Sequence, residues 1–451
     1  MNGRYHRCGL VAALLWAGLV GAAERVPRPD LSSAYRTPEA VYPGLVSPWR
    51  EGLDLGLLAA ALGAAAWLAH RRRSRPGLVV LSLLCLAYFG FWREACLCPV
   101  GSPQLMVEGL ATGLALPLSA VVFFVLPLLA ALLFGRVFCA AVCPLGALQD
   151  LVAVRPHRLS PGLNAGLQML PVVILALTVL LAATQTAYLT CRFDPLIALL
   201  RRTGSTHGVL MGAVILLLGI VVARPVCRFL CPYGVLLRGL SRLSWWRVTI
   251  TPDTCVSCRL CVDSCPFDAI EGPTPEAPAE PLRTGTRRLA VLCLFAPLLL
   301  VGFALGFSRL APHLARLQAD VRLADHFALE QAGRAQPTLE SVAFRSGSRS
   351  IAALQAAARE RREALRRGGV WAGAFVGLVL AARLIGASRR QRRGGFEPDR
   401  GRCLSCGRCF RYCPKEHDLC NNDGPWYSAP RGRFGRPGQR PGYPSTAKIE
   451  P

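Results

Sequence analysis

Lysine is almost missing from this 451-residue chain, and acidic residues are scarce. Lys415 and Lys448 are the only lysines, so arginine carries nearly all of the net charge of +25. The sequence contains no stripe of basic and aromatic residues of the kind that is typical of a nucleic-acid surface. Much of the arginine instead flanks long apolar runs, which is typical of membrane anchoring. We therefore expect membrane lipid, and no nucleic acid, as the partner of this charge.

The sequence also lacks the usual signatures of a stand-alone catalyst. Its seven histidines form no facing pair within two apolar runs, so a haem held by two histidines inside a membrane is not expected. No glycine-rich phosphate loop, nucleophile triad or pair of catalytic carboxylates stands out. Cysteine, with 19 residues, is the residue type left to carry chemistry.

Long apolar runs broken by arginine dominate the chain, which is 52% hydrophobic. They are too long and too free of charge for a set of soluble domains, and a membrane-spanning helix needs about 17–25 such residues. We predict seven transmembrane helices, at 53–70, 78–94, 113–134, 163–187, 207–223, 288–307 and 370–386. The predicted fold class is an all-α polytopic membrane protein with an internal two-fold repeat and a small cytoplasmic two-cluster ferredoxin-like module.

Arginine in the short loops predicts how these helices are oriented, because cytoplasmic loops carry the excess of positive charge. Arginine clusters place the loops after the first, third and fifth helices, and the C-terminal segment, in the cytoplasm. These clusters begin at Arg71, Arg136, Arg224 and Arg389. Arg192, Arg201 and Arg202 disagree, since the same topology places them outside. We expect a multi-pass protein of the bacterial inner (cytoplasmic) membrane.

The segments around the spans complete the expected organisation. Residues 1–23 have the basic start, apolar stretch and small-residue end of a signal peptide, with an N-terminal anchor as the alternative. Residues 24–52 are expected to be periplasmic. The other expected units are a membrane core with two Cys-Pro repeats (53–245), a first cluster motif (246–275), a linker (276–287), a periplasmic helical loop (308–369), a second cluster motif (395–420) and a disordered tail (421–451).

The strongest signal is the spacing Cys-x2-Cys-x2-Cys-x3-Cys-Pro, which occurs twice. We call Cys255, Cys258, Cys261 and Cys265 the N-terminal quartet, and Cys403, Cys406, Cys409 and Cys413 the C-terminal quartet. This spacing lets one loop bind three corners of a [4Fe–4S] cluster, and in two-cluster ferredoxins the fourth cysteine ligates the other cluster. We therefore predict two [4Fe–4S] clusters that exchange Cys265 and Cys413. Structural zinc and disulfides are the alternatives, but zinc sites usually have separated cysteine pairs.

A second signal is a Cys-x3-Cys-Pro-x-Gly turn, which also occurs twice, about ninety residues apart. Its cysteines are Cys139, Cys143, Cys227 and Cys231, which we call the four-cysteine set. In a helical turn, positions i and i+4 share one face, so each pair can present two thiols to one metal. Soft thiolates suit an iron–sulfur cluster, an iron or a copper(I) ion, and packing of the thiols as small apolar groups is the alternative.

Cys96, Cys98 and Cys191 form a third group, which the topology places at the periplasmic face with Asp194 nearby. A metal or redox-active site is one interpretation, and a disulfide with one free thiol is another, because this compartment is oxidising. Cys85 and Cys293 lie within spans and are expected to pack as apolar groups.

The two Cys-x3-Cys-Pro turns followed by two ferredoxin quartets resemble the NapH/NosR-type membrane polyferredoxins. The resemblance covers most of residues 75–275 and the stretch 400–415. It implies a membrane core with both clusters on the cytoplasmic side, and a relay of electrons between a cytoplasmic or quinol donor and a periplasmic flavoprotein or reductase. The chain departs from the pattern in its single Cys191 and in the two spans between the quartets.

The leading interpretation is thus an electron-transfer subunit rather than a stand-alone catalyst. The alternative is a maturation factor that handles metal for a periplasmic metalloenzyme. A redox sensor is a third possibility, against which the lack of a recognisable output domain argues.

Overall fold

A computed structural model of the protein describes residues 47–93, 101–113, 116–153, 156–189, 200, 206–250, 255, 257–274, 281–347, 349–388, 393 and 395–414. The expected signal peptide, the C-terminal tail, and Cys96, Cys98 and Cys191 lie outside these residues. The chain divides into two units, Met1–Ser47 and Pro48–Pro451. The second unit holds all the elements described below.

The described residues are mostly helical. The first helices are α2 (Pro48–His70), α3 (Arg75–Cys85) with its π-helical continuation η1 (Leu86–Trp92), α4 (Ser102–Thr112), α5 (Leu118–Phe134), the π-helix η2 (Phe138–Val142), α6 (Pro144–Val152), α7 (Pro161–Leu167) and α8 (Leu170–Ala183). Then come α11 (Thr206–Val221), α12 (Pro225–Phe229), α13 (Pro232–Ser241), α14 (Leu260–Ser264), α15 (Leu282–Leu314), the 3-10 turn η3 (Ala315–Leu317), α16 (Ala319–Gln331), α17 (Leu339–Arg345), α18 (Ile351–Ser388) and α19 (Arg408–Tyr412). Two short strands, β1 (Ile270–Glu271) and β2 (Glu397–Pro398), form an antiparallel pair.

Among the residues that the structure describes, five helices are long and apolar enough to cross a membrane. They are Trp49–His70, Arg75–Trp92, Pro161–Ala183, Arg283–Leu317 and Ile351–Ser388. The other two predicted spans correspond to shorter apolar helices, Leu118–Phe134 and Gly208–Val221. The prediction of a mostly helical fold with several helices that could span a membrane is therefore confirmed, while the seven spans, the internal repeat and the cytoplasmic side of the clusters stay predictions.

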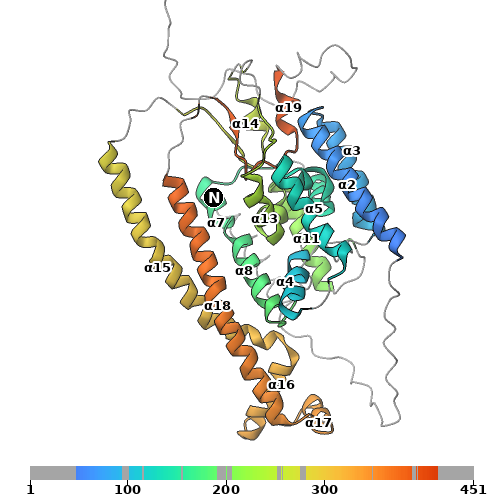
Figure 1. Ribbon diagram of the computed structural model, residues 1–451, viewed down its shortest axis with the longest axis vertical. Helices are drawn as coiled ribbons and strands as arrows, with labels where there is room; N and C mark the ends of the chain where they lie inside the picture. Colours follow the sequence, from blue (N-terminus) through green and yellow to red (C-terminus); the bar gives the residue numbers. More distant parts are fainter. Residues whose placement is uncertain are drawn as a thin grey trace, which may run out of the picture. The chain divides into compact units, whose positions relative to one another are not determined.

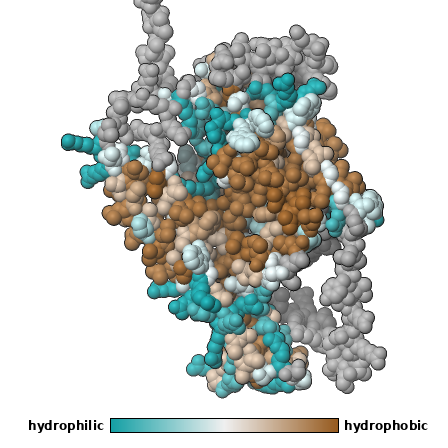
Figure 2. Space-filling view, viewed as in Figure 1, coloured by the Kyte–Doolittle hydropathy of each residue, from teal (hydrophilic) through white to brown (hydrophobic). Residues whose placement is uncertain are grey.

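The outer surface of these helices is apolar. Leu294 and Leu298 of α15 and Leu217 of α11 expose about two thirds or more of their side chains, at 77%, 65% and 64%. Figure 2 shows a broad hydrophobic band between two hydrophilic ends of the face in view. An apolar surface of this extent is unusual on a soluble monomer, whereas lipid covers it without cost.

Helices α15 and α18 lie side by side along much of their length (Figure 1). Gly369, Gly373 and Gly377 of α18 are spaced at intervals of four residues and face α15. A Cβ atom built on Gly373 would lie 2.2 Å from the carbonyl oxygen of Phe303, so only glycine fits there. Small residues at this spacing let two helix backbones approach closely inside a membrane.

The expected spans 288–307 and 370–386 are the apolar parts of these two longer helices. Residues 351–369, expected as part of a periplasmic loop, continue α18 as one helix, because alanine, leucine and arginine there favour helix and no proline interrupts them. The connecting segment is therefore shorter than expected. It contains α16 and α17, and the fully buried Phe327 of α16 packs in one core with Leu354 of α18. In Figure 1, α16 and α17 lie at the opposite end of the α15–α18 pair from α14 and α19.

We expect the substitution Gly373→Leu to separate α15 from α18, because its side chain must displace the backbone of Phe303. Overpacking of this kind costs about 1–3 kcal/mol or more. Gly386→Leu is the matched control, since Gly386 lies on the same helix and nothing lies within 4 Å of the position that a Cβ atom would take there. The measurement is the thermal unfolding of the detergent-solubilised protein, and equal melting temperatures for the two variants would contradict the proposed packing.

Candidate functional site

The two quartets have the same local backbone geometry. In the N-terminal quartet, Ser257 and Arg259 adopt left-handed conformations with φ of 52° and 63°. Ser405 and Gly407 stand at the corresponding places of the C-terminal quartet, with φ of 53° and 70°. Each loop then forms one short helix, α14 or α19, which ends at the fourth cysteine in extended backbone. Left-handed residues turn the chain back on itself, which brings the cysteines of one run together.

The two loops meet although more than a hundred residues separate them. Strands β1 and β2 pair Ile270 with Pro398 and Glu271 with Glu397. The backbone N–H of Asp399 donates to the carbonyl oxygen of Ala269 at 2.6 Å. Glu271 accepts ion pairs from Arg393 and Arg402, which lie on either side of β2. The chain between them crosses the apolar band in α15 and returns in α18, so both quartets lie at the same end (Figure 1).

The thiols of the two quartets lie close enough to interact electrostatically, and the interactions cross between the loops. Cys261 interacts with Cys258, Cys255 and, from the other loop, with Cys413 and Cys409. Cys265 in turn neighbours Cys406 and Cys403. This is the arrangement that exchange of the fourth cysteine requires.

Burial raises the pKa of four of these thiols. The pKa of Cys403 rises to about 12, and those of Cys261, Cys265 and Cys409 are also raised. Neighbouring thiols raise the pKa further, because two thiolates repel each other. These four groups are therefore neutral thiols at pH 7 unless a cation stabilises the thiolates, which is what iron does on binding.

The four-cysteine set comes together as well. Cys139 lies in the π-helix η2, Cys143 precedes α6, Cys227 lies in α12 and Cys231 precedes α13. All four line one cavity, together with Phe138 and Tyr233. A π-helix is rare and often marks a functional site.

The thiols of this set are held by specific contacts. The Cys143 thiol donates a hydrogen bond to Cys227. Gln149 Nε2 donates to the Cys227 sulfur at 3.3 Å, and Arg136 Nη2 lies 3.7 Å from the Cys139 sulfur. The hydrogen bond from Cys143, with help from Arg224, lowers the pKa of Cys227 to about 7 against the effect of burial. The same hydrogen bond, together with burial, holds the pKa of Cys143 well above its usual range.

A buried ion pair joins the two turns of the four-cysteine set. Arg224 is fully buried, and its Nε and Nη2 atoms donate to Asp150 at 2.9 and 2.8 Å. Its Nη1 donates to the carbonyl oxygen of Cys139. Asp150 also lies 3.4 Å from Arg75 and 3.6 Å from Arg408. Burial tends to raise the pKa of Asp150, but Arg224, Arg408 and Arg75 outweigh it and hold that pKa below its usual range.

Arginines also attach both quartets to the membrane core. Arg75 Nη1 donates to the carbonyl oxygen of Cys406 at 2.9 Å, and Arg136 Nη1 to that of Gly401 at 3.3 Å. Arg228 Nη1 donates to the carbonyl oxygen of Pro266 at 3.2 Å, and its Nη2 pairs with Asp268 at 3.1 Å. The sequence alone presents arginine in these loops only as a sign of membrane topology. The signal that could have identified these contacts is Arg136 and Arg224, each three residues before the first cysteine of a turn.

Other expected site residues are not brought together. Cys96, Cys98, Cys191 and Asp194 lie outside the described residues. Cys85 is buried in α3, as expected for a packing residue, whereas Cys293 is exposed on the apolar surface of α15. Within the residues that the structure describes, no three cysteine, histidine, aspartate or glutamate side chains converge to hold a single metal ion. A cluster is different, because each of its thiolates binds a different iron atom.

Comparison with known proteins identifies the class of site. A family described as "4Fe-4S binding domain" matches residues 116–161 and again residues 206–250, which contain the four-cysteine set. A second family with the same description matches residues 248–271, which contain the N-terminal quartet. An uncharacterized protein of Methanocaldococcus jannaschii is 30% identical over 193 residues, covering 41% of this chain and 79% of that protein. The chain belongs to this family of 4Fe-4S ferredoxin-type proteins.

Two named relatives fit this assignment. The methylamine utilization ferredoxin-type protein MauN of Methylobacillus flagellatus is 25% identical over 240 residues, or 49% of this chain and 83% of MauN. The putative electron transport protein YccM of Escherichia coli is 24% identical over 164 residues, or 33% of this chain and 46% of YccM. No solved structure matches the chain. The predicted resemblance to polyferredoxins is confirmed at this level, while its narrower NapH/NosR form stays a prediction.

We expect Asp150→Asn to destabilise the protein, because it leaves the fully buried Arg224 without its carboxylate. Breaking a buried ion pair costs about 3–5 kcal/mol. Asp320→Asn is the control, since Asp320 and its partner Arg349 are both more than half exposed, and an exposed pair contributes about 0–1 kcal/mol.

Thermal unfolding at pH 7 measures the difference between these two variants. The lowered pKa keeps Asp150 charged at this pH, and its contribution is lost only as the pH falls below the ordinary carboxyl range. If Asp150→Asn were no less stable than Asp320→Asn, the ion pair between Arg224 and Asp150 would not hold the two turns of the four-cysteine set together.

Proposed function

We propose that the protein is a membrane-anchored iron–sulfur electron-transfer protein that relays single electrons through two [4Fe–4S] clusters. One cluster is held by Cys255, Cys258, Cys261 and Cys413, and the other by Cys403, Cys406, Cys409 and Cys265. The observation that carries this proposal is that the two loops pack together through α14 and α19, and that Cys261 interacts electrostatically with Cys413 while Cys265 interacts with Cys406. That crossing between the two loops has a direct explanation in shared clusters.

The residues present fit such a cluster. Each run offers four sulfur donors, and no imidazole lies within it. The single carboxylate within the two runs, Asp263, pairs with Arg158 at 3.7 Å. The left-handed residues Ser257 and Ser405 curve the loops around the sulfurs. Arginines supply positive charge nearby, which an anionic cluster needs in a buried site. A bound [4Fe–4S] cluster supplies reversible one-electron transfer, with a potential set by charge and hydrogen bonds around it.

A further metal centre at the four-cysteine set extends this proposal. The set lines one cavity, the two segments that contain it each match a 4Fe-4S binding family, and the pKa of Cys227 favours a thiolate. An iron–sulfur cluster suits this description better than a single iron or copper ion. The C-terminal quartet lies outside the matched residues, so its cluster rests on the spacing and on the contacts described above.

Orientation in the membrane is part of the proposal. We infer that the quartets lie on the cytoplasmic side and that α16 and α17 lie in the periplasm. The arginine-rich loops at the quartet end and the apolar band between the two ends support this assignment (Figure 2). Electrons would pass between a cytoplasmic or quinol donor and a periplasmic redox partner. The names of YccM, an electron transport protein, and MauN, a ferredoxin-type protein, support the electron-transfer role.

Exchange of ligands makes a specific prediction for iron content. Cys413→Ser should reduce the occupancy of the cluster held mainly by the N-terminal quartet, and Cys265→Ser that of the other cluster. Anaerobic purification should give about eight irons per chain for two cubanes, and a larger count if the four-cysteine set is filled. Each substitution should remove about four irons or alter the electron paramagnetic resonance signal of one cluster.

Cys293→Ser is the matched control, because Cys293 is exposed on α15, away from the quartets. Iron content of Cys413→Ser and Cys265→Ser equal to that of the control would contradict the proposed ligand sets. A colourless, iron-free parent protein purified without oxygen would overturn the electron-transfer role.

Topology can be tested independently with introduced cysteines. Leu339 lies on α17 and is 70% exposed, so a cysteine introduced by Leu339→Cys is accessible to a reagent on that side. Pro273 lies in the exposed segment after β1, so Pro273→Cys reports on the quartet end. We expect a membrane-impermeant maleimide to label Leu339→Cys in intact spheroplasts and Pro273→Cys only after permeabilisation, with the parent protein as background. Labelling of both from the same side would exclude the proposed orientation.

A further inference from the structure

The two turns of the four-cysteine set correspond residue by residue but differ in charge. Arg136 and Arg224 each stand three residues before the first cysteine of their turn, 88 positions apart. Seven residues after the second cysteine, the first turn has Asp150, whereas the second has Arg238. Equivalent positions of the two turns therefore carry a carboxylate in the first turn and a guanidinium in the second.

On one side of the set, the arginine is neutralised. Arg224 forms two hydrogen bonds with the Asp150 carboxylate, and its remaining donors bind the carbonyl oxygens of Cys139 and Ala140. Gly146 leaves room for this guanidinium, since its Cβ position would lie 3.3 Å from Arg224 Nη1. Arg224 and Asp150 together add no net charge beside the sulfurs.

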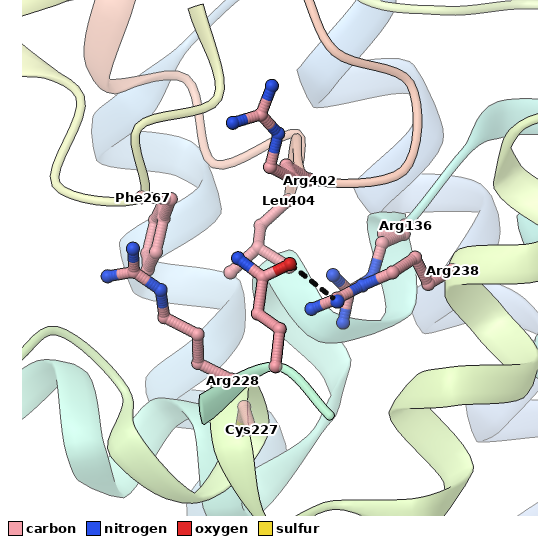
Figure 3. A pocket seen from close by; sticks show the side chains of 8 residues that line it. Arg136, Cys227, Arg228, Arg238, Phe267, Arg402 and Leu404 are labelled. Carbon is pink, nitrogen blue, oxygen red and sulfur yellow. Dashed lines mark hydrogen bonds between the residues drawn. The ribbon is translucent and has the colours of Figure 1, made fainter. Parts of the chain in front are cut away.

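On the other side, the arginine is not neutralised. Arg136 is only 2% exposed and lines a pocket with Arg238, Gln168 and Cys227 (Figure 3). Its donors reach the carbonyl oxygen of Gly401 and the sulfur of Cys139, and its Nε has no hydrogen-bond partner in the described part of the protein. Arg238 donates to Gln168 Oε1 at 3.1 Å, and its Nε is likewise buried without a partner among the described residues.

This second side faces the C-terminal quartet. Arg136 donates to Gly401, two residues before Cys403, and its charge acts on the Cys403 sulfur. The other residues of the pocket include Phe267 and Leu404, each adjacent in sequence to the proline or cysteine of a quartet. Arg136 is buried and Arg238 is partly buried, and two like charges that interact in such a place are unfavourable by themselves. Such a pair becomes favourable where negative charge accumulates next to it.

We propose that the Arg136–Arg238 pair is an electrostatic element that raises the reduction potential of the four-cysteine centre and so makes it the electron acceptor for the C-terminal quartet. This inference rests on the proposed function. A centre held by the four-cysteine set would accept the same single electron that a cluster on the C-terminal quartet gives up, with no bond made or broken and no proton transferred. The N–H of Arg136 points at the Cys139 sulfur, so it stabilises the additional negative charge there more than at the quartet.

The sharpest test is Arg238→Asp, which gives the second half the arrangement of the first. The new carboxylate would neutralise Arg136 as Asp150 neutralises Arg224. We expect the midpoint potential of one iron–sulfur signal to fall by at least 59 mV, a tenfold change in the one-electron equilibrium. Arg238→Gln should lower it by less. The measurement is a potentiometric titration of the anaerobically purified full-length protein, monitored by electron paramagnetic resonance.

Two further variants separate charge from structure. Arg242→Gln is the matched control, because it removes the same charge from an exposed position four residues further along the chain, where solvent screens it. Arg136→Lys keeps the charge and should retain most of the potential, whereas Arg136→Gln should lower it. Iron content confirms that each variant has assembled its clusters.

The outcomes distinguish this inference from the function on which it rests. Normal iron content with every signal at its parental potential in Arg238→Asp would overturn the electrostatic role alone. A fall of equal size in Arg242→Gln would also overturn it, since the effect would then come from net charge and not from the Arg136–Arg238 pair. A parent protein without iron–sulfur signals would overturn the proposed function itself.

Discussion

The ion pair between Arg224 and Asp150 is the contact at which the parts of the site meet. It joins the two turns that carry the four-cysteine set, and Asp150 is shared with Arg75 and Arg408, which belong to the first membrane loop and to the C-terminal quartet. A buried guanidinium needs a carboxylate, and a carboxylate shared by three arginines must stay where all three can reach it. The positions of both cysteine systems follow from this requirement.

Burial creates the chemical character of the site as well as its geometry. Burial, with help from neighbouring thiols, makes a thiol resist ionisation, as the raised pKa of Cys403 shows. A hydrogen bond from Cys143, with help from Arg224, overcomes that resistance at Cys227, whose pKa is lowered. A site of this kind is neutral without metal and accepts positively charged iron readily, because each iron replaces protons on sulfur and removes the repulsion between thiolates. The distribution of arginine then determines which part of the site holds negative charge best.

The α15–α18 pair has a different role. It contributes no described cysteine to the proposed sites, yet it carries the chain across the apolar band and back, so that the C-terminal quartet reaches the N-terminal one. The glycines of α18 keep the two helices in close contact where lipid gives no hydrophobic force to hold them together. The packing of Leu180 and Leu181 of α8 in one core with Leu354 and Leu365 of α18 links the pair to the membrane core.

Sequence by itself determined the elements whose signal is local. Long apolar runs predicted the helices, because a run that is buried or covered by lipid has few alternatives to a helix. Two of the resulting helices are shorter than a full membrane span. Spacing within each quartet predicted a cluster-binding loop, because four cysteines so close together have few other uses. The exchange of Cys265 and Cys413 stays a prediction, which the nearness of Cys261 to Cys413 supports. Only the tertiary structure decided which arginines are neutralised. Arg136 and Arg224 look alike along the chain, and what distinguishes them is the residue that folding brings opposite each one, Arg238 or Asp150, across a distance that no local pattern records.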